Sequence, residues 1–251
     1  MAIKAFILCS LFFILYSEKM KELVESLLPL ERDLFFALNG SDSSFLDNVM
    51  WTISGRFIWI PVFLFVLFIF FYRARKNEAI LVTLFLILLF VATDQISSSF
   101  FKPFFERFRP THHPDFKDMV DIINGYRGGR YGFISGHATN SFGLAVFLSL
   151  VFRNRLVTLI TLLWAAINSY TRIYLGVHFI SDILAGMIVG ALVALLLYTV
   201  YATLRKAIIQ PPSSRRLSPY GKKEGTILAT FIILYLVIIA IFSPLLATLP
   251  H

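Results

Sequence analysis

Residues 179–201 read FISDILAGMIVGALVALLLYTVY, and this stretch contains no charged side chain after Asp182. At 1.5 Å per residue, a helix over this range is roughly 34 Å long, close to the hydrocarbon thickness of a bilayer. In lipid the backbone polar groups of such a stretch are satisfied only if it forms a helix. The stretch therefore predicts a spanning helix whose one charged residue, Asp182, lies near its amino-terminal end.

Five further segments have the same apolar character and would be roughly 24–34 Å long as helices. They are residues 57–72, 79–101, 137–152, 156–172 and 226–247. Of the 251 residues, 57% are hydrophobic and 27 are phenylalanine, whereas soluble domains contain about 45–50% apolar residues. The ten-residue alternation of membrane β-barrel strands is absent. We therefore expect an all-α fold, a polytopic membrane bundle of about six spanning helices.

The amino-terminal region is less clear. Residues 3–16 suit either a signal-peptide core or a short seventh membrane helix, and we expect retention because no A-x-A-like cleavage site follows. The single cysteine, Cys9, lies there, so we expect it to pack and to form no disulfide within the chain. Apolar residues then recur at helical spacing over 17–28 among charged ones. This amphipathic helix lies either in the membrane interface or on the bundle.

The sequence thus divides into four regions. These are an amino-terminal apolar segment with the interfacial helix (1–56), a catalytic membrane bundle (57–201), a basic cytoplasmic linker (202–225) and an additional carboxyl-terminal spanning helix (226–251).

The formal net charge of +8 belongs to loops beside apolar spans. Anionic lipid head groups explain such charges, so we expect the bilayer as a partner and no nucleic acid. Loops 73–78, 153–155 and 202–225 together carry eleven Lys or Arg residues against two Glu. Cytoplasmic loops are enriched in Lys and Arg, which places these three in the cytoplasm. The long loop 102–136, with whatever chemistry it carries, then faces outward.

Three polar stretches lie on that outer side. In the first, Lys102 and Arg109 are seven residues apart, so two helical turns would put both cations on one face as an anion site. Cations that snorkel at the membrane edge are the alternative interpretation. In the second, Ser135-Gly136-His137 opens an apolar helix, where backbone amides favour anionic oxygens. His137 there can exchange a proton near pH 7.

The third stretch contains Arg172, His178 and Asp182. His178 and Asp182 are at positions i and i+4, neighbours on one helical face if the helix begins there. A carboxylate bonded to one imidazole nitrogen fixes the tautomer and leaves the other nitrogen as a nucleophile. Ionisable residues within membrane spans are costly and are functional by default.

Together, Lys102-x6-Arg109-Pro110, Ser135-Gly136-His137 and Arg172-x5-His178-x3-Asp182 resemble the three signature motifs of the type 2 phosphatidic acid phosphatase (PAP2) family. The resemblance is to its bacterial membrane lipid phosphatase branch and covers about residues 95–200. Two positions depart from the family pattern. Ile134 stands where the family usually has proline, and Thr171 stands where it usually has serine.

The resemblance implies a metal-independent membrane hydrolase that removes phosphate from a lipid and needs no cofactor. His178 would attack phosphorus to form a phosphohistidine, Asp182 would orient it, and His137 would protonate the leaving oxygen. The substrate phosphate would be bound by Lys102, Arg109, Ser135, Gly136 and Arg172.

Several alternatives stay open. The substrate could be a polyprenyl diphosphate, lipid A, phosphatidylglycerol phosphate or phosphatidic acid, and the acceptor could be a second lipid in place of water. A non-catalytic transporter is the rival of a different class, although inverted halves are not evident. A vanadium-dependent haloperoxidase, from the family that shares this fold core, is disfavoured by the number of spans. The sequence indicates no oligomeric state.

Three other polar features have two interpretations each. The neighbouring histidines His112 and His113 could suggest a metal site, but no acidic residue follows them at the spacing that metal ligands need. We therefore expect them to lie in a loop over the phosphate-binding site. Asp94 either supports one of the site's bases or pairs with a neighbouring span. Arg127 and Arg130 either meet a second phosphate or a sugar, or belong to a solvated loop.

Overall fold

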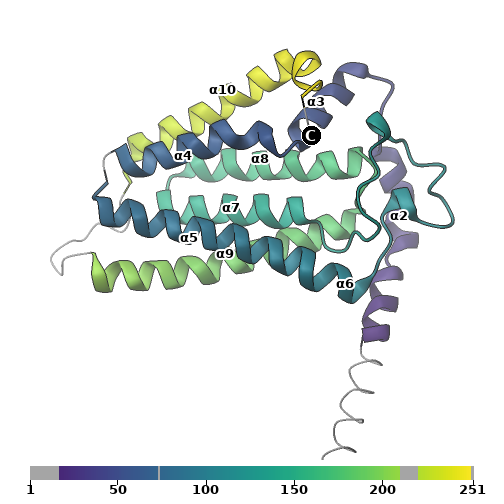
Figure 1. The fold of residues 1–251 in the computed structure, drawn as a ribbon, viewed down its shortest axis with the longest axis horizontal. Helices are drawn as coiled ribbons and strands as arrows, with labels where there is room; N and C mark the ends of the chain where they lie inside the picture. The colour runs from purple at the N-terminus through teal and green to yellow at the C-terminus, as the bar shows by residue number, and fades with distance from the viewer. Residues whose placement is uncertain (1–16, 73, 210–219, 250–251) are drawn as a thin grey trace, which may run out of the picture.

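The computed structural model describes residues 17–72, 74–209 and 220–249, and within these ranges the chain is helical with no strand (Figure 1). Residues 17–25 are also helical. The longer elements are α2 (Leu28–Leu38), α3 (Ser44–Ser54), α4 (Ile60–Tyr72), α5 (Lys76–Gln95), α6 (Lys102–Phe105), α7 (Gly136–Phe152), α8 (Arg155–Tyr174), α9 (Ile180–Ile208) and α10 (Lys222–Leu246). A π-helical turn, Ile96–Phe101, joins α5 to α6 without a break.

The six segments predicted to span are all helical, which confirms the all-α polytopic bundle. Four helices are long and apolar enough to cross a membrane: Lys76–Phe105, α8, α9 and α10. A fifth crossing is possible if Ser44–Ser54 and Phe57–Tyr72, bent by 73° at their junction, count as one span. The remaining predicted segment is α7, an apolar helix of 17 residues.

The two largest differences from the sequence prediction concern α9 and α3. Helix α9 continues to Ile208, seven residues beyond the predicted end at 201, because no helix-breaking residue interrupts it. Helix α3 was not predicted, since its apolar residues are too few for a span. Ser43 caps α3 by accepting a hydrogen bond from the amide of Leu46 at 3.3 Å.

Helix α7 is the centre of the bundle and packs against α5, α8 and α9 (Figure 1). Its contact with α9 is very close at Gly190, where a Cβ atom would lie 2.2 Å from the carbonyl oxygen of Thr139. Small residues allow helices to approach closely in membranes, where lipid gives no hydrophobic drive to associate. This contact holds the first turn of α7, which carries predicted site residues, against the body of α9.

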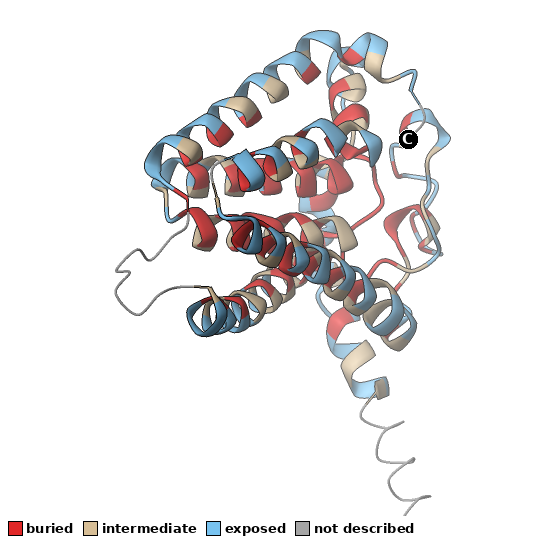
Figure 2. Cartoon of the chain, turned by 60° about the vertical axis from the view of Figure 1, so that its left-hand side comes forward, coloured by how far each residue is buried: buried red, intermediate tan, exposed pale blue. Residues whose placement is uncertain are grey.

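The outward faces of the helices are apolar and exposed, whereas the buried positions face the inside of the bundle (Figure 2). Leu64 on α4, Ile87 on α5 and Leu196 on α9 are all more than half exposed. Such surfaces are costly in water and suited to lipid. The burial pattern therefore agrees with a bundle whose solvent is the bilayer.

The connections lie at two opposite ends of the bundle (Figure 1). The α4–α5 and α7–α8 turns share one end with the carboxyl end of α9 and the amino end of α10. The segments 106–135 and 175–179 share the other end. The basic loops and the motif-bearing loops are therefore on opposite ends, as the sequence predicted if each span crosses.

The amphipathic segment packs on the bundle, one of its two predicted placements. Val24 is buried in a cluster with Phe105, Phe133 and Ile134, while Leu23 on the same helix is 58% exposed. Helix α2 continues along this end and packs Phe35 against Phe179 at a ring distance of 5.4 Å. The predictions for residues 3–16 and for Cys9 fall outside the described residues.

Candidate functional site

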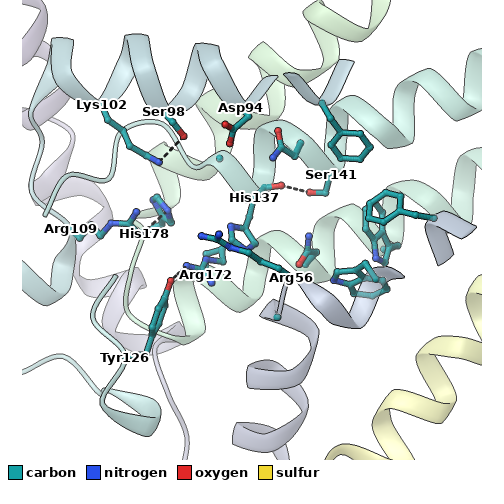
Figure 3. Close-up of a pocket in the computed structure, with 18 residues that line it drawn as sticks. Arg56, Asp94, Ser98, Lys102, Arg109, Tyr126, His137, Ser141, Arg172 and His178 are labelled. Atoms are coloured by element: carbon teal, nitrogen blue, oxygen red, sulfur yellow. Dashed lines mark hydrogen bonds between the residues drawn. The ribbon is translucent and has the colours of Figure 1, made fainter. Parts of the chain in front are cut away.

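A cavity of about 360 Å³ lies at the end of the bundle that carries the motif-bearing loops (Figure 3). It is lined by six of the predicted site residues: Lys102, Arg109, Gly136, His137, Arg172 and His178. Their side chains come from α6, α7, α8 and two loops, and they gather around His178 and His137. The three motifs, far apart in the sequence, thus meet in one place.

His178 lies in the short connection between α8 and α9, and its ring is 2% exposed. Its Nδ1 is 3.2 Å from Oδ2 of Asp182. A carboxylate can only accept, so Nδ1 carries the proton and Nε2 presents a lone pair. Nη1 of Arg109 donates to this Nε2 at 3.2 Å. The pair therefore has the tautomer that a nitrogen nucleophile needs.

The start of α9 explains how this pair forms. The helix begins at Ile180, so His178 precedes it, and the two residues do not share a helical face as the spacing argument assumed. Instead, Oδ2 of Asp182 accepts the amide of Phe179 at 3.0 Å and caps the helix. The same oxygen then meets the ring of His178, because the chain turns there.

Burial and the nearby cations, first Arg109 and then Arg172, hold the pKa of His178 well below its ordinary value. Desolvation and like charge both disfavour the imidazolium form. The ring is therefore neutral at pH 7, and its Nε2 lone pair is available.

Arg109 does not share a helical face with Lys102, which corrects the sequence argument. Helix α6 ends at Phe105, and Glu106 has a left-handed φ of 50° that turns the chain. Arg109 nevertheless reaches the cavity, where its Nε donates to the carbonyl of Tyr131 at 3.1 Å. Burial, and next Arg172, lower the pKa of Arg109 to about 10, so it stays charged at pH 7.

Residues 107–109 are extended and pair with residues 130–132. The amide of Arg109 donates to the carbonyl of Arg130 at 3.1 Å, and the amide of Gly132 donates to the carbonyl of Arg107 at 2.9 Å. In an extended chain, side chains two residues apart point to one face. Arg107 and Arg109 therefore both reach the His178–Asp182 pair, and a Cβ at Gly132 would lie 3.1 Å from Oδ2 of Asp182.

Arg172 lies in the last turn of α8 and is 2% exposed. One end of its guanidinium donates to the hydroxyl of Ser54, and Nη2 donates to the hydroxyl of Tyr126 at 3.0 Å. Burial raises the pKa of Tyr126, but the charge and hydrogen bond of Arg172 outweigh it, and the net shift is downward. This network holds Arg172 against the cavity wall.

His137 lies in the first turn of α7 and is half-buried. Its Nε2 is 3.2 Å from the carbonyl oxygen of Ser54, which can only accept. Nε2 therefore carries a proton, and Nδ1 is the nitrogen that can exchange one. Ser54 thus contacts both His137 and Arg172, so the end of α3 forms one wall of the site.

Ser135 and Lys102 have different surroundings. Ser135 is fully buried, and its hydroxyl caps α7 by accepting the amide of Ala138 at 3.4 Å. It does not line the cavity, so its contact with phosphate stays a prediction. Lys102 lines the cavity and its Nζ donates to Ser98 at 3.4 Å.

Sequence reasoning missed two cations. Arg56, exposed at the bend between α3 and α4, lines the cavity near Arg172 (Figure 3). Arg107 is buried behind the pair, and its Nη1 donates to Oδ1 of Asp182 at 2.8 Å. Arg107 could have been found from the sequence, because it lies inside the first motif, two residues before Arg109. No signal marked Arg56.

The other polar residues resolve as follows. Asp94 lines the cavity but makes none of the ion pairs found among the described residues. His113 is buried, bonded to Glu25 at 3.3 Å and stacked on Phe116. Arg127 and Arg130 are exposed in the loop. Over the ranges that the structure covers, no group of three His, Cys, Asp or Glu residues could hold a metal ion.

Three comparisons with known proteins show which family this chain resembles. Residues 83–206 match the model of the PAP2 superfamily. The chain is 47% identical over 182 residues to a lipid A 4′-phosphatase of Porphyromonas gingivalis, covering 72% of this chain and 77% of that protein. It is 38% identical over 177 residues to a lipid A 4′-phosphatase of Bacteroides thetaiotaomicron, covering 70% and 79%.

Among solved structures, it resembles the first transmembrane PAP2-type phosphatidylglycerolphosphate phosphatase from Bacillus subtilis. The TM-score is 0.56 at 21% identity, and the match covers 80% of this chain and 97% of that one. At this level of identity the likeness concerns the fold.

Proposed function

The chain belongs to the PAP2 superfamily and is a membrane lipid phosphatase, and we propose that it removes the 4′-phosphate of lipid A through a phosphohistidine intermediate. The choice of lipid is supported by two relatives that bear this activity in their names and match this chain over 72% and 70% of its length. The choice of mechanism is supported by the arrangement around His178.

One observation carries the mechanism. Nδ1 of His178 is held by Asp182 at 3.2 Å, and Nε2 faces a cavity that four cations line. A phosphate monoester held by these cations would place its phosphorus within reach of Nε2. Charge that develops on the phosphoryl oxygens would be stabilised by Lys102, Arg109 and Arg172.

The proposed reaction has two steps. In the first, the Nε2 lone pair of His178 bonds to phosphorus, the bond from phosphorus to the sugar oxygen breaks, and that oxygen takes the Nδ1 proton of protonated His137. In the second, His137 takes a proton from water, the water oxygen bonds to phosphorus, and the phosphorus–Nε2 bond breaks. Inorganic phosphate leaves, and both histidines return to their starting states.

We further propose that the protein lies in the bacterial cytoplasmic membrane with its site at the outer face. The motif-bearing loops and the basic loops lie at opposite ends of the bundle, and the excess of Lys and Arg favours the cytoplasm for the latter. Labelling with a membrane-impermeant maleimide in intact cells tests this. In a Cys9→Ser background, Asp118→Cys should react and Lys206→Cys should not, and the reverse pattern would overturn the orientation.

Phosphate release by the purified protein tests the activity. Lipid A, phosphatidylglycerol phosphate, undecaprenyl diphosphate and phosphatidic acid are supplied side by side with a chelator present. We expect release from lipid A well above the rest, and a loss on the order of 10³-fold or more in His178→Ala, since nucleophile knockouts remove most of the acceleration. Folding of the variant is checked by its melting temperature.

Other outcomes would change the proposal. Release mainly from another of the four lipids would change the proposed substrate and leave the proposed mechanism unchanged. Disappearance of lipid phosphate without free phosphate would indicate transfer to a second lipid. Full activity in His178→Ala would overturn the phosphohistidine.

A further inference from the structure

Behind the His178–Asp182 pair lies a buried group of charges that the proposed reaction does not use. Arg107, whose side chain is 2% exposed, is its centre. The guanidinium donates from Nη1 to Oδ1 of Asp182 at 2.8 Å and from Nη2 to Oε1 of Glu31 at 2.7 Å. The arginine thus links the carboxylate that orients His178 to a carboxylate on α2.

Glu31 also holds the first turn of α9 directly. Its Oε2 accepts the amide of Ser181 at 2.7 Å, and its Oε1 accepts the hydroxyl of Ser181 at 2.7 Å. That hydroxyl in turn accepts Nη1 of Arg107 at 2.7 Å. A carboxylate at a helix amino terminus satisfies otherwise unpaired amides and is favoured by the helix dipole. The neighbouring residue in this turn is Asp182.

Arg107 is the single cation of this group and pairs with three carboxylates, Asp182, Glu31 and Glu25. Burial alone would lower the pKa of Arg107, but Asp182, Glu31 and the half-exposed Glu25 outweigh it, and the net shift is upward. Taking Glu31 away would leave Asp182 as the principal buried counter-ion of Arg107. A carboxylate that a cation holds more tightly is a weaker acceptor for the imidazolium that forms when His178 attacks.

We propose that Glu31 is a positioning residue of the phosphatase reaction, acting through Arg107 and Ser181 on Asp182 and His178. The inference rests on the proposed role of His178 as nucleophile. Glu31 lies outside the matched family region, residues 83–206, and does not line the cavity. The amino-terminal helix α2 is thereby part of the catalytic apparatus and more than a covering element.

The test is the kinetics of Glu31→Gln on the lipid that the wild type hydrolyses best. Loss of a residue that orients a metal-ligating histidine typically costs 10–100-fold, and we expect kcat to fall by about the same range here. The KM should stay within about twofold, because Glu31 does not line the cavity. The matched control is Asp33→Asn on the same helix, whose exposed carboxylate pairs only with Arg32 in the described contacts.

The pH profile separates positioning from loose packing. Removing a negative charge lowers the pKa of His178 further, so the acid limb of kcat/KM should move to lower pH by up to ~1 unit. Glu31→Asp, which keeps the charge, should restore most of this shift. The ionisable groups around His178 are Lys102 of α6, Arg107 and Arg109 of the loop, His137 of α7, Arg172 of α8 and Asp182 of α9.

Ser181→Ala is the second variant, because it removes two of the hydrogen bonds without leaving a buried charge. It should lower kcat several-fold without changing KM. If both Glu31→Gln and Ser181→Ala keep the wild-type kcat and pH profile, or raise KM alone, the inference is overturned. The wild type and His178→Ala measure the proposed function separately, so a failure here with intact wild-type activity concerns Glu31 only.

Discussion

The guanidinium of Arg109 donates through Nη1 to Nε2 of His178 at 3.2 Å, so the free site holds its nucleophilic lone pair against a cation. If His178 is the nucleophile, as proposed, a phosphate that enters must accept this hydrogen bond from Arg109 before Nε2 can attack phosphorus. The same Nη1 also donates to the carbonyl of Val177 at 3.2 Å, which keeps the guanidinium beside the ring. In the proposed reaction, Arg109 shields the lone pair while the site is free and binds the phosphoryl oxygens once substrate enters.

Arg109→Lys should lower kcat by roughly 10²–10³-fold, because a lysine keeps the charge but loses the planar fork that serves two acceptors. Arg130→Lys is the matched control, since Arg130 is exposed and stacks on Phe108 at 5.1 Å. The measurement is steady-state phosphate release. Equal rates for the two variants would contradict the role of Arg109.

The acid limb of kcat/KM should lie below pH 6.5. The pKa of His178 is lowered by burial and then by Arg109 and Arg172, so its reactive neutral form persists below the ordinary value and is lost only at lower pH. The substrate phosphate itself titrates near pH 6, so a second profile is needed. Arg109→Gln removes a positive charge next to His178. If His178 sets the acid limb of kcat/KM, this limb should move to higher pH. A limb set by the substrate phosphate would stay in place.

Arg56→Gln should raise KM by roughly 5–10-fold with kcat little changed, because an exposed cation at the cavity contributes about 1 kcal/mol to holding an anion. Arg153→Gln is the control. That arginine lies at the opposite end of the bundle, where it contacts the hydroxyl of Tyr198. A KM equal to that of the control would exclude Arg56 from substrate binding.

Vanadate should inhibit competitively, because its trigonal-bipyramidal adducts resemble phosphoryl transfer at Nε2 of His178. A chelator added without vanadate should leave the rate unchanged. Calorimetric titration of His178→Ala should show weaker vanadate binding than the wild type. Loss of activity with the chelator, restored by a divalent metal, would contradict the metal-independent mechanism.

Gly190→Ala should lower the melting temperature, since its Cβ would lie 2.2 Å from the carbonyl oxygen of Thr139 and force α7 and α9 apart. Overpacking of this kind costs about 1–3 kcal/mol. Gly129→Ala, where no atom lies within 4 Å of the added Cβ, should leave the melting temperature unchanged. Equal melting temperatures would mean that the helix contact can relax.

The sequence by itself determined the helical segments of the bundle, the family and six of the residues that line the cavity. Apolar length and the membrane's demand for satisfied backbone groups leave little choice but helices, so all six predicted segments are helical. The motifs could be found because each keeps its polar residues within a short stretch. The spacing arguments within those stretches were less reliable. Lys102 and Arg109 converge through the turn at Glu106, and His178 and Asp182 meet through a helix cap.

Only the tertiary structure decided which residues support the motif residues. Glu31 meets Arg107 across 76 positions, and Ser54 meets His137 across 83. Arg56 reaches the cavity because α3 and α4 bend by 73° beside it. Such pairings depend on how helices pack, and packing is set by close contacts such as Gly190 on Thr139 that no local pattern encodes. A buried charge must find a partner, but the sequence does not say which one.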